Sequence, residues 1–598
     1  MRLPLIACRF VLSLHLLLAA GACAAVHYVD INSAAPTAPY STWATAARTI
    51  QDAIDAAFAD DEVIVTNGIY AVGGRVVDGA ITNRVAVTKA LTIRSVNGPQ
   101  FTTIHGSQVP GTTNGDGAVR CVYLTHYAVL SGFTLTNGAT RTVHDDLVES
   151  AGGGLWCLST NAVATNCVLA GNSAHYLGGG TLNGTLRNCL LSNNAARIGG
   201  GAAFRGLLID CTVAGNAGGG GGGADQSRLF RCLLAGNRAN STGGGADYST
   251  LVDCVLSNNT AAVGGGVWFS TLTNCMLVSN SASDGGAADY STLADCTLTG
   301  NRASYFGGGA HQSTLFRCRL EANSASYGGG AREGKLYNCT LRDNTATNTG
   351  GGALSAALTN CTLTGNAAAL GGGAGFSVLQ NCIVYFNAAP NGSNWYGGEV
   401  NYCCTAPVLM GSGFGNFNLE PRFIDRASGD LRLQSNSPCI NAGLNSSVPA
   451  GPDLDGAARI AGPTVDVGAY EFQSPRSVLP YAWLEQHGLL TDGSADFTDT
   501  DGDGLNNAEE CRCGTVPTDA ASVLQMLASE PRAFGMLLRW QSAWGRRYNL
   551  ELCTNLALPP TQRFQVFATN IFGQDETTSY GDTAPQATKV RLYRVVVP

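Results

Sequence analysis

Apolar residues recur through the middle of the chain with a period of 21 or 22 residues. Eleven cysteines mark this period, and a Leu or Val follows each of them by two positions. Residues two positions apart point to the same side of a strand, so the pattern predicts an inward apolar column and no helical face. The cysteines are Cys167, Cys189, Cys211, Cys232, Cys254, Cys275, Cys296, Cys318, Cys339, Cys361 and Cys382.

Polar residues repeat with the same period. An asparagine stands five residues after every one of these cysteines, from Asn172 to Asn387, and a run of glycines precedes most of them. We expect the asparagines to form a stacked amide ladder at a turn, where their side chains satisfy backbone groups. The glycines fit a tight turn that needs positive φ or a close backbone approach.

These units predict a solenoid. Each is too short to contain a crossover helix, and stacking of successive units would bury the apolar column. A leucine-rich repeat is the main alternative, but it needs a denser leucine pattern. The sequence therefore predicts an all-β protein whose body is a right-handed parallel β-helix with about 21–22 residues per coil. Residues 535–598 alternate apolar and polar positions, which predicts a small C-terminal β-sandwich.

The cysteine column is open to two interpretations. Free cysteine is a small, well-buried apolar side chain, which suits an inward column. Cysteines of neighbouring coils would also lie at Cα separations that a disulfide can bridge, so partial bridging remains an alternative. Nearer the C-terminus, Cys511 and Cys513 are open to bridging elsewhere, for example to Cys553.

Shifts in composition divide the chain into six segments. Residues 49–57 have helical spacing, which predicts a helix that caps the first coils. Residues 139–150 depart from the period and predict a loop that projects from the solenoid. The segments are a signal peptide (1–25), an N-terminal cap with the first coils (26–150), the regular coils (151–410), a closing region (411–473), a linker with an acidic loop (474–520) and the β-sandwich (521–598).

The N-terminus predicts export. Arg2 precedes a mostly apolar stretch from Val11 to Ala20, and small residues follow, which is typical of a signal peptide cleaved before Val26. Lipidation of Cys23 is the less favoured alternative, because Ala20 occupies the position that such a signal usually fills with a more apolar residue. No second apolar run is long enough to span a membrane, so we expect a secreted or cell-surface protein without a transmembrane helix.

Charge narrows the choice of partners. Charged residues make up only 13% of the chain and the net charge is -8. No basic stripe is present to neutralise phosphates, so we expect no nucleic-acid partner. A neutral glycan and calcium are both compatible with this balance, and we expect a monomer.

Family resemblance agrees with the periodicity. The strings TIQDAIDAA (49–57), DEVIVTNGIY (61–70) and LTIRSVNGP (91–99), followed by the coils, resemble the pectin-lyase-like superfamily of bacterial β-helix proteins. The coils are also similar to the Gly-Gly repeats of polymorphic outer-membrane autotransporter passengers. Residues 420–471 resemble the choice-of-anchor Q region, which closes such helices in bacterial surface proteins. The resemblance implies architecture and a surface or secreted location, because fold does not fix activity.

A calcium loop is predicted in the linker. Asp499, Asp501 and Asp503 alternate, Leu505 can offer its carbonyl, and Glu510 stands at the closing position of a twelve-residue loop. The segment resembles thrombospondin type 3 and dockerin-like repeats, and that register makes Glu509 an alternative to Glu510. We therefore expect a structural Ca²⁺, against the alternative of a solvated acidic turn.

A candidate ligand groove follows from the repeat. The positions seven and six residues before successive cysteines would each form a column on one face of the coils. Carboxylates, an imidazole, a guanidinium and aromatic rings on one stripe suit a sugar-binding groove. The alternative is an exposed position that drifts among polar residues. The candidates are Asp225, Asp247, Tyr248, Trp268, Asp289, Tyr290, His311, Arg332 and Glu333.

Three functions remain open at this point. We favour a non-catalytic protein that binds a polysaccharide, a cell-surface glycan or another surface. A polysaccharide lyase or glycoside hydrolase is the first alternative, and a purely structural stalk is the second. The Asn-Thr-Asp, Gly-His-Gly and Arg-Ile-Lys elements of polygalacturonases are absent from the sequence, which argues against catalysis of that type.

Overall fold

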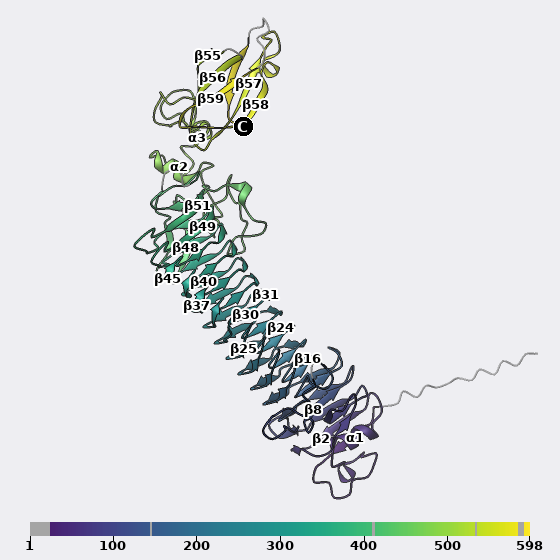
Figure 1. The fold of residues 1–598 in the computed structure, drawn as a ribbon. Helices are drawn as coiled ribbons and strands as arrows, with labels where there is room; N and C mark the ends of the chain where they lie inside the picture. Colours follow the sequence, from purple (N-terminus) through teal and green to yellow (C-terminus); the bar gives the residue numbers. More distant parts are fainter. Residues whose placement is uncertain (1–23, 144–145, 409–412, 533–534, 584–590) are drawn as a thin grey trace, which may run out of the picture.

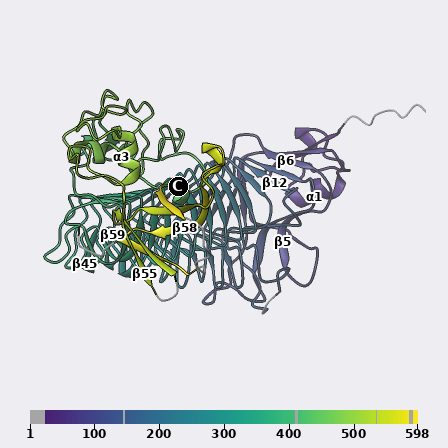
Figure 2. The same cartoon turned by 90° about the horizontal axis from the view of Figure 1, so that it is seen from above.

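The chain is a long parallel β-solenoid with a small antiparallel unit at its C-terminal end (Figure 1). The computed structural model describes residues 24–143, 146–408, 413–532, 535–583 and 591–598. Seen from above, the coils form a regular stack of parallel bands (Figure 2). The predicted signal peptide and Cys23 lie outside the described residues, apart from Ala24 and Ala25. None of the described helices is long and apolar enough to cross a membrane.

The N-terminal coils carry the predicted capping helix. Helix α1 begins after Thr49, whose hydroxyl accepts a hydrogen bond from the Asp52 backbone, and its buried face places Ile50 and Ile54 over the first coil. The elements here are β1 (Val26–Val29), η1 (Trp43–Thr45), α1 (Ile50–Ala56), β2 (Glu62–Val65), β3 (Gly68–Tyr70), β4 (Arg75–Val76), β5 (Thr82–Val87), β6 (Thr92–Ser95), β7 (Thr102–His105), β8 (Val119–Leu124), β9 (Val129–Ser131) and β10 (Thr134–Thr136).

Each regular coil has three or four short strands separated by left-handed residues. In one coil these residues are Gly243, Tyr248, Asp253 and Asn258, with φ of 60°, 43°, 55° and 54°. The chain bends at each left-handed residue. Together these bends bring the end of one coil to a position directly above its start. This explains why the repeat is rich in Gly, Asn and Asp, the residues that adopt this conformation most readily.

The two strands before each cysteine belong to one sheet. The first set is β11 (Leu155–Cys157), β15 (Thr181–Leu182), β19 (Ala203–Phe204), β23 (Ala224–Asp225), β27 (Ala246–Asp247), β30 (Val267–Trp268), β34 (Ala288–Asp289), β38 (Ala310–His311), β42 (Ala331–Arg332), β46 (Ala353–Leu354), β49 (Ala374–Gln380) and β51 (Trp395–Asn401). The second set is β12 (Val163–Thr165), β16 (Thr185–Arg187), β20 (Leu207–Ile209), β24 (Arg228–Phe230), β28 (Thr250–Val252), β31 (Thr271–Thr273), β35 (Thr292–Ala294), β39 (Thr314–Phe316), β43 (Lys335–Tyr337) and β47 (Ala357–Thr359).

The strands after each cysteine form the remaining faces. One face contains β13 (Val168–Ala170), β17 (Leu190–Ser192), β21 (Thr212–Ala214), β25 (Leu233–Ala235), β29 (Val255–Ser257), β32 (Met276–Val278), β36 (Thr297–Thr299), β40 (Arg319–Glu321), β44 (Thr340–Arg342), β48 (Thr362–Thr364), β50 (Ile383–Val384) and β52 (Cys404–Thr405). The other contains β14 (Ser173–Ala174), β18 (Ala195–Ala196), β22 (Ala217–Gly218), β26 (Arg238–Ala239), β33 (Ser281–Asp284), β37 (Arg302–Phe306), β41 (Ser324–Tyr327) and β45 (Thr345–Thr349).

The interior is built from the predicted columns. Cys254 and Leu256 are buried, and Leu256 pairs in register with the leucines of the coils on either side. The asparagines form the expected ladder: Asn259 Nδ2 donates to Asn280 Oδ1 at 2.9 Å and to the Leu234 carbonyl at 3.0 Å. All nineteen cysteines of the described residues are free, so the alternative of bridged cysteines, including Cys511 or Cys513 with Cys553, is wrong.

The closing region and the linker that follows it pack against the last coils. Their apolar residues, among them Phe423, Leu431 and Leu484, form a second core cluster with Ile383 and Cys404 of the solenoid. The Asn360 side chain donates to the Asp466 carbonyl at 3.3 Å, which ties this segment to a corner of the coils. The elements are β53 (Phe423–Asp425), β54 (Asp430–Leu433), η2 (Asn445–Ser447), α2 (Tyr481–Gln486) and α3 (Asn507–Cys513).

The C-terminal unit consists of two three-stranded antiparallel sheets. Leu538 and Trp540 of one sheet and Tyr548 and Leu550 of the other form a shared buried core, as the predicted β-sandwich requires. The elements are β55 (Met526–Arg532), β56 (Gly535–Ser542), β57 (Arg547–Cys553), η3 (Pro560–Gln562), β58 (Gln565–Phe572), β59 (Glu576–Asp582) and β60 (Leu592–Val596). Phe414 contacts Trp544 at a ring-centroid separation of 5.5 Å, where the solenoid end meets the sandwich.

Candidate functional site

Six of the predicted site residues form one column across adjacent coils. Each is the last residue of a two-residue strand, and the parallel register pairs each with the next member of the column. We call this column the acidic stripe; it contains Asp225, Asp247, Trp268, Asp289, His311 and Arg332. The spacing argument therefore placed these side chains together correctly.

The carboxylates of the acidic stripe are buried, although they lie outside the apolar core. Asp225 is 8% exposed, Asp247 is 4% and Asp289 is 1%. The Oδ1 atoms of Asp225 and Asp247 have no hydrogen-bond partner among the described residues. Buried polar atoms without partners carry a free-energy penalty, so these two carboxylates are unfavourable for the stability of the fold.

Two glycines make room for these carboxylates. A Cβ added to Gly199 would lie 2.3 Å from Asp225 Oδ2, and one added to Gly220 would lie 2.8 Å from Asp247 Oδ2. The corresponding position in the next coil is Thr242, whose hydroxyl donates to Asp247 Oδ2 at 2.7 Å. The acidic pair therefore occupies space that any larger residue at those two positions would fill.

Burial changes the protonation of this pair. It raises the pKa of Asp225 to about 7, and the neighbouring charge of Asp247 contributes to the same shift. Burial also raises the pKa of Asp247 to about 6, against the lowering effect of the Thr242 hydroxyl. The two carboxyl groups therefore titrate near neutral pH, which is where an acid–base pair would need to operate.

The other end of the acidic stripe contains its two basic side chains, His311 and Arg332. His311 Nδ1 lies 3.1 Å from Asp289 Oδ1. The Arg332 guanidinium stands 3.5 Å from the centre of the Phe306 ring and 2.7 Å from Glu333 Oε1. His311 and Arg332 therefore each have a carboxylate beside them, and Glu333 extends the polar surface outward.

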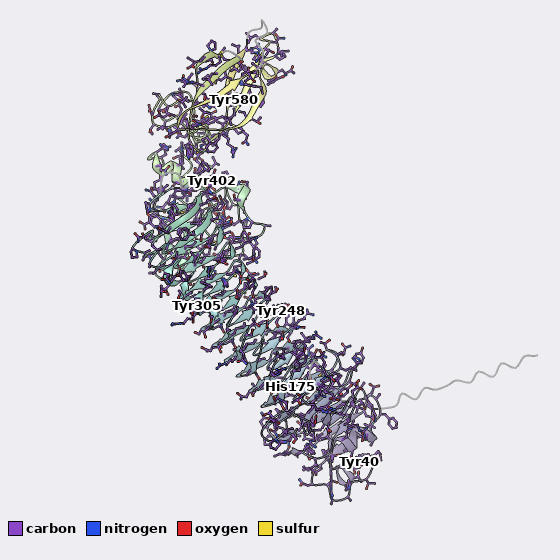
Figure 3. The ribbon with its side chains drawn as sticks, in the orientation of Figure 1. Tyr40, His175, Tyr248, Tyr305, Tyr402 and Tyr580 are labelled. Atoms are coloured by element: carbon purple, nitrogen blue, oxygen red, sulfur yellow. The ribbon has the colours of Figure 1, made fainter. Side chains whose placement is uncertain are left out.

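An exposed row of aromatic rings borders the acidic stripe. We call it the aromatic ladder; it consists of Tyr248, Phe269 and Tyr290. Phe269 stacks on Tyr248 at 5.5 Å with planes 20° apart, and on Tyr290 at 5.0 Å with planes 3° apart. All three rings are 44–53% exposed, and Figure 3 shows Tyr248 on the flank of the solenoid.

The aromatic ladder sits on a strained backbone. Tyr248, Phe269 and Tyr290 have φ of 43°, 42° and 47°. Bulky residues adopt this left-handed conformation at a cost, and such positions concentrate at functional sites. The left-handed turn directs the rings outward next to the acidic stripe.

The acidic stripe lies at one corner of the solenoid, and in the first coils apolar side chains fill this corner. Leu182 and Phe204 occupy the column positions that Asp225 and Asp247 hold further along, and they form a closed cluster with Trp156. The Trp156 indole donates to the Leu147 carbonyl at 2.8 Å. The described part of the loop predicted to project therefore folds against this cluster, and the polar part of the corner begins at Asp225.

The predicted calcium loop has converging carboxylates. Ligand atoms of Asp499, Asp501 and Asp503 all lie within 4.8 Å of one another. Glu510 is fully buried, and burial together with the charges of Asp501 and Asp503 raises its pKa to about 7. Oxygens of Asp501, Asp503 and Glu510 are buried without a hydrogen-bond partner in the described chain. The donor set is therefore the hard-oxygen set that Ca²⁺ prefers.

The two glutamates of this loop have different places. Glu509 is exposed, and its carboxylate accepts a hydrogen bond from the Asn506 backbone as part of the N-terminal cap of α3. Glu510 is buried instead, and it lies near enough to Asp501 and Asp503 for their charges to contribute to its raised pKa. Leu505 is half-buried and its backbone N–H donates to Asp503 Oδ1 at 2.8 Å. This arrangement favours Glu510 over Glu509 as the closing residue.

Comparisons with known proteins report on architecture alone. No family model and no curated protein matches the chain. Among solved structures it is similar to pectate lyase Pel9A, with 12% identity over 75% of this chain and 96% of that chain and a TM-score of 0.23. It is also similar to the Dettilon tailspike protein, with 12% identity, 60% and 69% coverage and a TM-score of 0.28.

A third similar structure is the catalytic unit of a GH87 alpha-1,3-glucanase from Streptomyces thermodiastaticus. It has 12% identity over 62% of this chain and 65% of that chain, with a TM-score of 0.28. Similarity at these TM-scores carries no conclusion about the site. The solenoid is established by the strand register of this chain itself.

Sequence reasoning missed two residues that lie beside the acidic stripe. Asp284 and Phe306 stand twelve residues before their cysteines, on the far side of the glycine turn, and neither was selected. Asp284 Oδ1 is buried without a hydrogen-bond partner within the described residues, and Phe306 lies under Arg332. The signal was available, because the offset of twelve residues is as regular as the offset of seven.

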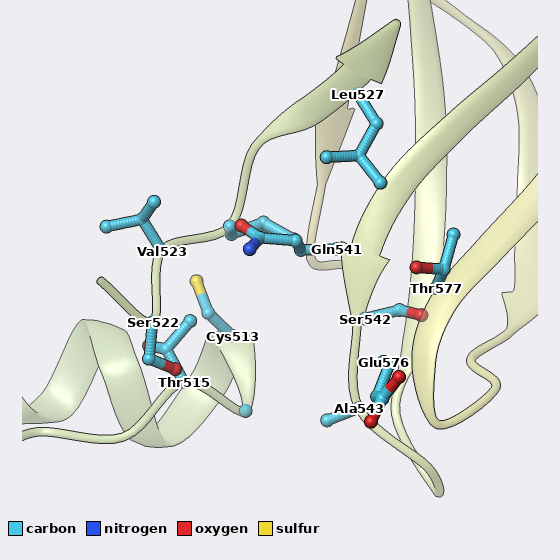
Figure 4. A pocket seen from close by; sticks show the side chains of 12 residues that line it. Cys513, Thr515, Ser522, Val523, Leu527, Gln541, Ser542, Ala543, Glu576 and Thr577 are labelled. Carbon is cyan, nitrogen blue, oxygen red and sulfur yellow. The ribbon is translucent and has the colours of Figure 1, made fainter. Parts of the chain in front are cut away.

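A separate cavity of about 420 Å³ lies beside the sandwich (Figure 4). Its lining includes Cys513, Ser522, Gln541 and Glu576. Burial raises the pKa of the Cys513 thiol, which lowers the thiolate fraction at neutral pH. A single unactivated thiol gives this cavity no evident chemistry.

Proposed function

We propose that this chain binds a glycan along the acidic stripe and the aromatic ladder. The observation that carries the proposal is the exposed, stacked row of Tyr248, Phe269 and Tyr290 beside the acidic stripe. Flat rings can stack on sugar faces, and the partly exposed Glu333 carboxylate can accept hydrogen bonds from hydroxyl groups. The three rings stand on left-handed residues directly after the strands of the acidic stripe, so the coil backbone fixes their positions and the site is preformed.

The charge of the corner limits the glycan. Asp225, Asp247, Asp284 and Asp289 lie at this corner, and the Arg332 guanidinium already pairs with Glu333. A polyuronate would bring further negative charge to buried carboxylates, which is unfavourable. We therefore infer a neutral or amino-sugar polymer as ligand.

A glycan array with the mature chain from Val26 tests the proposal. Phe269→Ala removes the central ring of the aromatic ladder, and we expect roughly a tenfold loss of affinity from lost stacking. Phe376→Ala is the matched control, because Phe376 is left-handed and exposed at the equivalent position of a later coil, beside Gly375 and away from the acidic stripe. If the array gives no glycan signal, or if both variants lose the same affinity, a purely structural stalk becomes the better explanation of this protein.

Glycoside hydrolysis is a second candidate function. It is favoured by the adjacent pair Asp225 and Asp247, because a hydrolase needs one protonated and one ionised carboxyl group near neutral pH. Asp247→Asn should abolish release of reducing ends while glycan binding persists. If the wild-type chain releases no reducing ends from any polymer it binds, the site is a binding site only.

We also propose that the loop after Thr498 holds a structural Ca²⁺ through Asp499, Asp501, Asp503 and Glu510, with the Leu505 carbonyl as a further ligand. The support is the buried, unpaired carboxylate oxygens in this part of the described chain. Calcium titration should raise the melting temperature of wild type. Glu510→Gln should reduce that shift strongly, and Glu509→Gln should leave it unchanged; the reverse pattern would assign the alternative register.

Export and surface location are part of the same proposal. The support is the N-terminal sequence and the resemblance of residues 420–471 to the choice-of-anchor Q region. N-terminal sequencing of the mature protein should begin near Val26. Retention in the lipid fraction that is lost in Cys23→Ser would instead establish a lipoprotein.

A further inference from the structure

A cavity of about 400 Å³ opens where the end of the solenoid, the closing region and the sandwich meet. Tyr402 comes from the last coil, Trp483 from α2, and Trp544 and Arg546 from the turn between β56 and β57. Figure 3 shows Tyr402 at the end of the solenoid that faces the sandwich. Cavities of this size between structural units are common positions for small ligands.

The aromatic residues give this cavity flat apolar walls. Trp544 is 56% exposed, although it also contacts Phe414 and Phe572 at ring-centroid separations of 5.5 and 5.3 Å. Those two contacts hold the indole in place while leaving more than half of it accessible. A fixed, accessible indole is a suitable surface for the face of a sugar ring.

The remaining lining is polar and carries one charge. Gln486 supplies a side-chain amide, whereas the Asn416 amide already bonds to the backbone of Val400 and Cys403 and the Thr464 hydroxyl donates to the Asn441 carbonyl. No acidic residue is among the described residues that line the cavity. Hydrogen-bonding groups of this kind match sugar hydroxyls. The absence of a carboxylate in the described lining separates this cavity from the acidic stripe.

Arg546 supplies the charge. Its stem lies against Gly514, and its guanidinium interacts with the Cys511 thiol, whose pKa is raised by burial against the lowering effect of Arg546. Arg422 and Arg591 each pair with a carboxylate, but Arg546 makes no ion pair with any residue in the described part of the chain. A half-buried guanidinium without a counter-ion favours an anionic group in the cavity, and its planar fork matches a carboxylate.

We propose that this cavity is a second saccharide site, specific for a carboxylated sugar unit such as a uronic acid. The sugar ring stacks on Trp544, its carboxylate pairs with Arg546, and its hydroxyls bind the Gln486 amide. The site is independent of the acidic stripe and takes a ligand of the opposite charge preference. Because its walls come from both the solenoid and the sandwich, bound ligand also holds the two units together.

Isothermal titration of the intact mature chain tests the proposal with four probes: glucuronic acid, galacturonic acid, glucose and glucose 6-phosphate. We expect a carboxylated sugar to bind about ten- to a hundredfold more tightly than glucose, the ratio that a charge-assisted pair supports. Arg546→Gln should remove this preference, and Trp544→Ala should weaken binding of every sugar. Arg547→Gln is the matched control, because that neighbouring exposed arginine binds Asn570 instead.

Several outcomes would overturn the proposal. They are equal binding of glucose and glucuronic acid, tighter binding of glucose 6-phosphate than of both uronic acids, and an equal effect of the Arg546 and Arg547 variants. Arg546→Lys keeps the charge without the fork and should retain part of the preference, which guards against a folding defect in the glutamine variant. Phe269→Ala should leave uronic-acid binding unchanged, so failure at this cavity is distinguishable from failure at the acidic stripe.

Discussion

The raised pKa values of Asp225 and Asp247 make the stability of the middle coils depend on pH. In the unfolded chain both carboxyl groups titrate near 3.8, whereas in the fold they titrate near 7 and 6. At about 1.4 kcal/mol per unit, the differences correspond to about 4 kcal/mol for Asp225 and about 3 kcal/mol for Asp247. Because the two charges interact, the joint effect is smaller than the sum.

The sign follows from the direction of the shifts. Both pKa values are raised in the fold, so the folded state binds more protons than the unfolded state between about pH 4 and pH 7. The contribution to stability is fully present below about pH 4 and is lost as the pH rises through 6 and 7. Asp225→Asn removes the charge, so it should stabilise the protein at pH 8, by up to about 4 kcal/mol, and have little effect at pH 4.

Denaturant unfolding of wild type, Asp225→Asn and Asp253→Asn at pH 4, 6 and 8 provides the measurement. Asp253 is exposed in the same coil as Asp247, so its variant should follow wild type at every pH. Hydrogen exchange of β23 and β27 localises the effect, because solenoids open locally. A wild-type profile that is flat from pH 4 to 8, or an Asp225→Asn variant that is less stable than wild type at pH 8, would refute the burial argument.

Three further predictions concern the coils. Thiol reagents should leave the cysteine column unmodified in the native protein and react with it only after denaturation, since every member is buried; mass spectrometry of alkylated peptides checks this. Asn259→Ala removes four hydrogen bonds of the ladder and should destabilise the fold by about 3 to 5 kcal/mol, measured by denaturant unfolding. Gly220→Val should crowd Asp247 Oδ2 and destabilise the protein, but by less in the background of Asp247→Ala, as a double-mutant cycle would show.

The fold could be predicted because the repeat shows which residues of each strand point into the core and which point outward. Cys254 and Leu256 point inward and Asn259 joins the amide ladder, so spacing alone fixes which residues stack. The burial of Asp247 could not be predicted in this way. An outward position normally faces water, and here only the glycine at position 220 and the neighbouring coil reveal that the carboxylate is enclosed.

The cavity beside Arg546 was outside the reach of sequence patterns for a different reason. Tyr402, Trp483 and Arg546 are far apart in the chain and belong to three structural units without a common period. Only the docking of the sandwich on the closed end of the solenoid brings them together. Repeats thus predict contacts between equivalent positions, but not contacts between a repeat and the units that follow it.

The corner of the solenoid offers a way to separate function from stability. Leu182 and Leu354 occupy the column of the acidic stripe in other coils, so the backbone accepts leucine at this position. Leucine has nearly the shape of aspartate, and replacing a buried charge by an apolar side chain of similar volume is often stabilising. The double variant Asp225→Leu with Asp247→Leu should therefore be more stable than wild type at pH 8 and should no longer bind glycan. Greater stability with unchanged glycan binding would show that the acidic pair takes no part in recognition. Lower stability would contradict the burial argument, because it would show that the fold already compensates the charge of the two carboxylates.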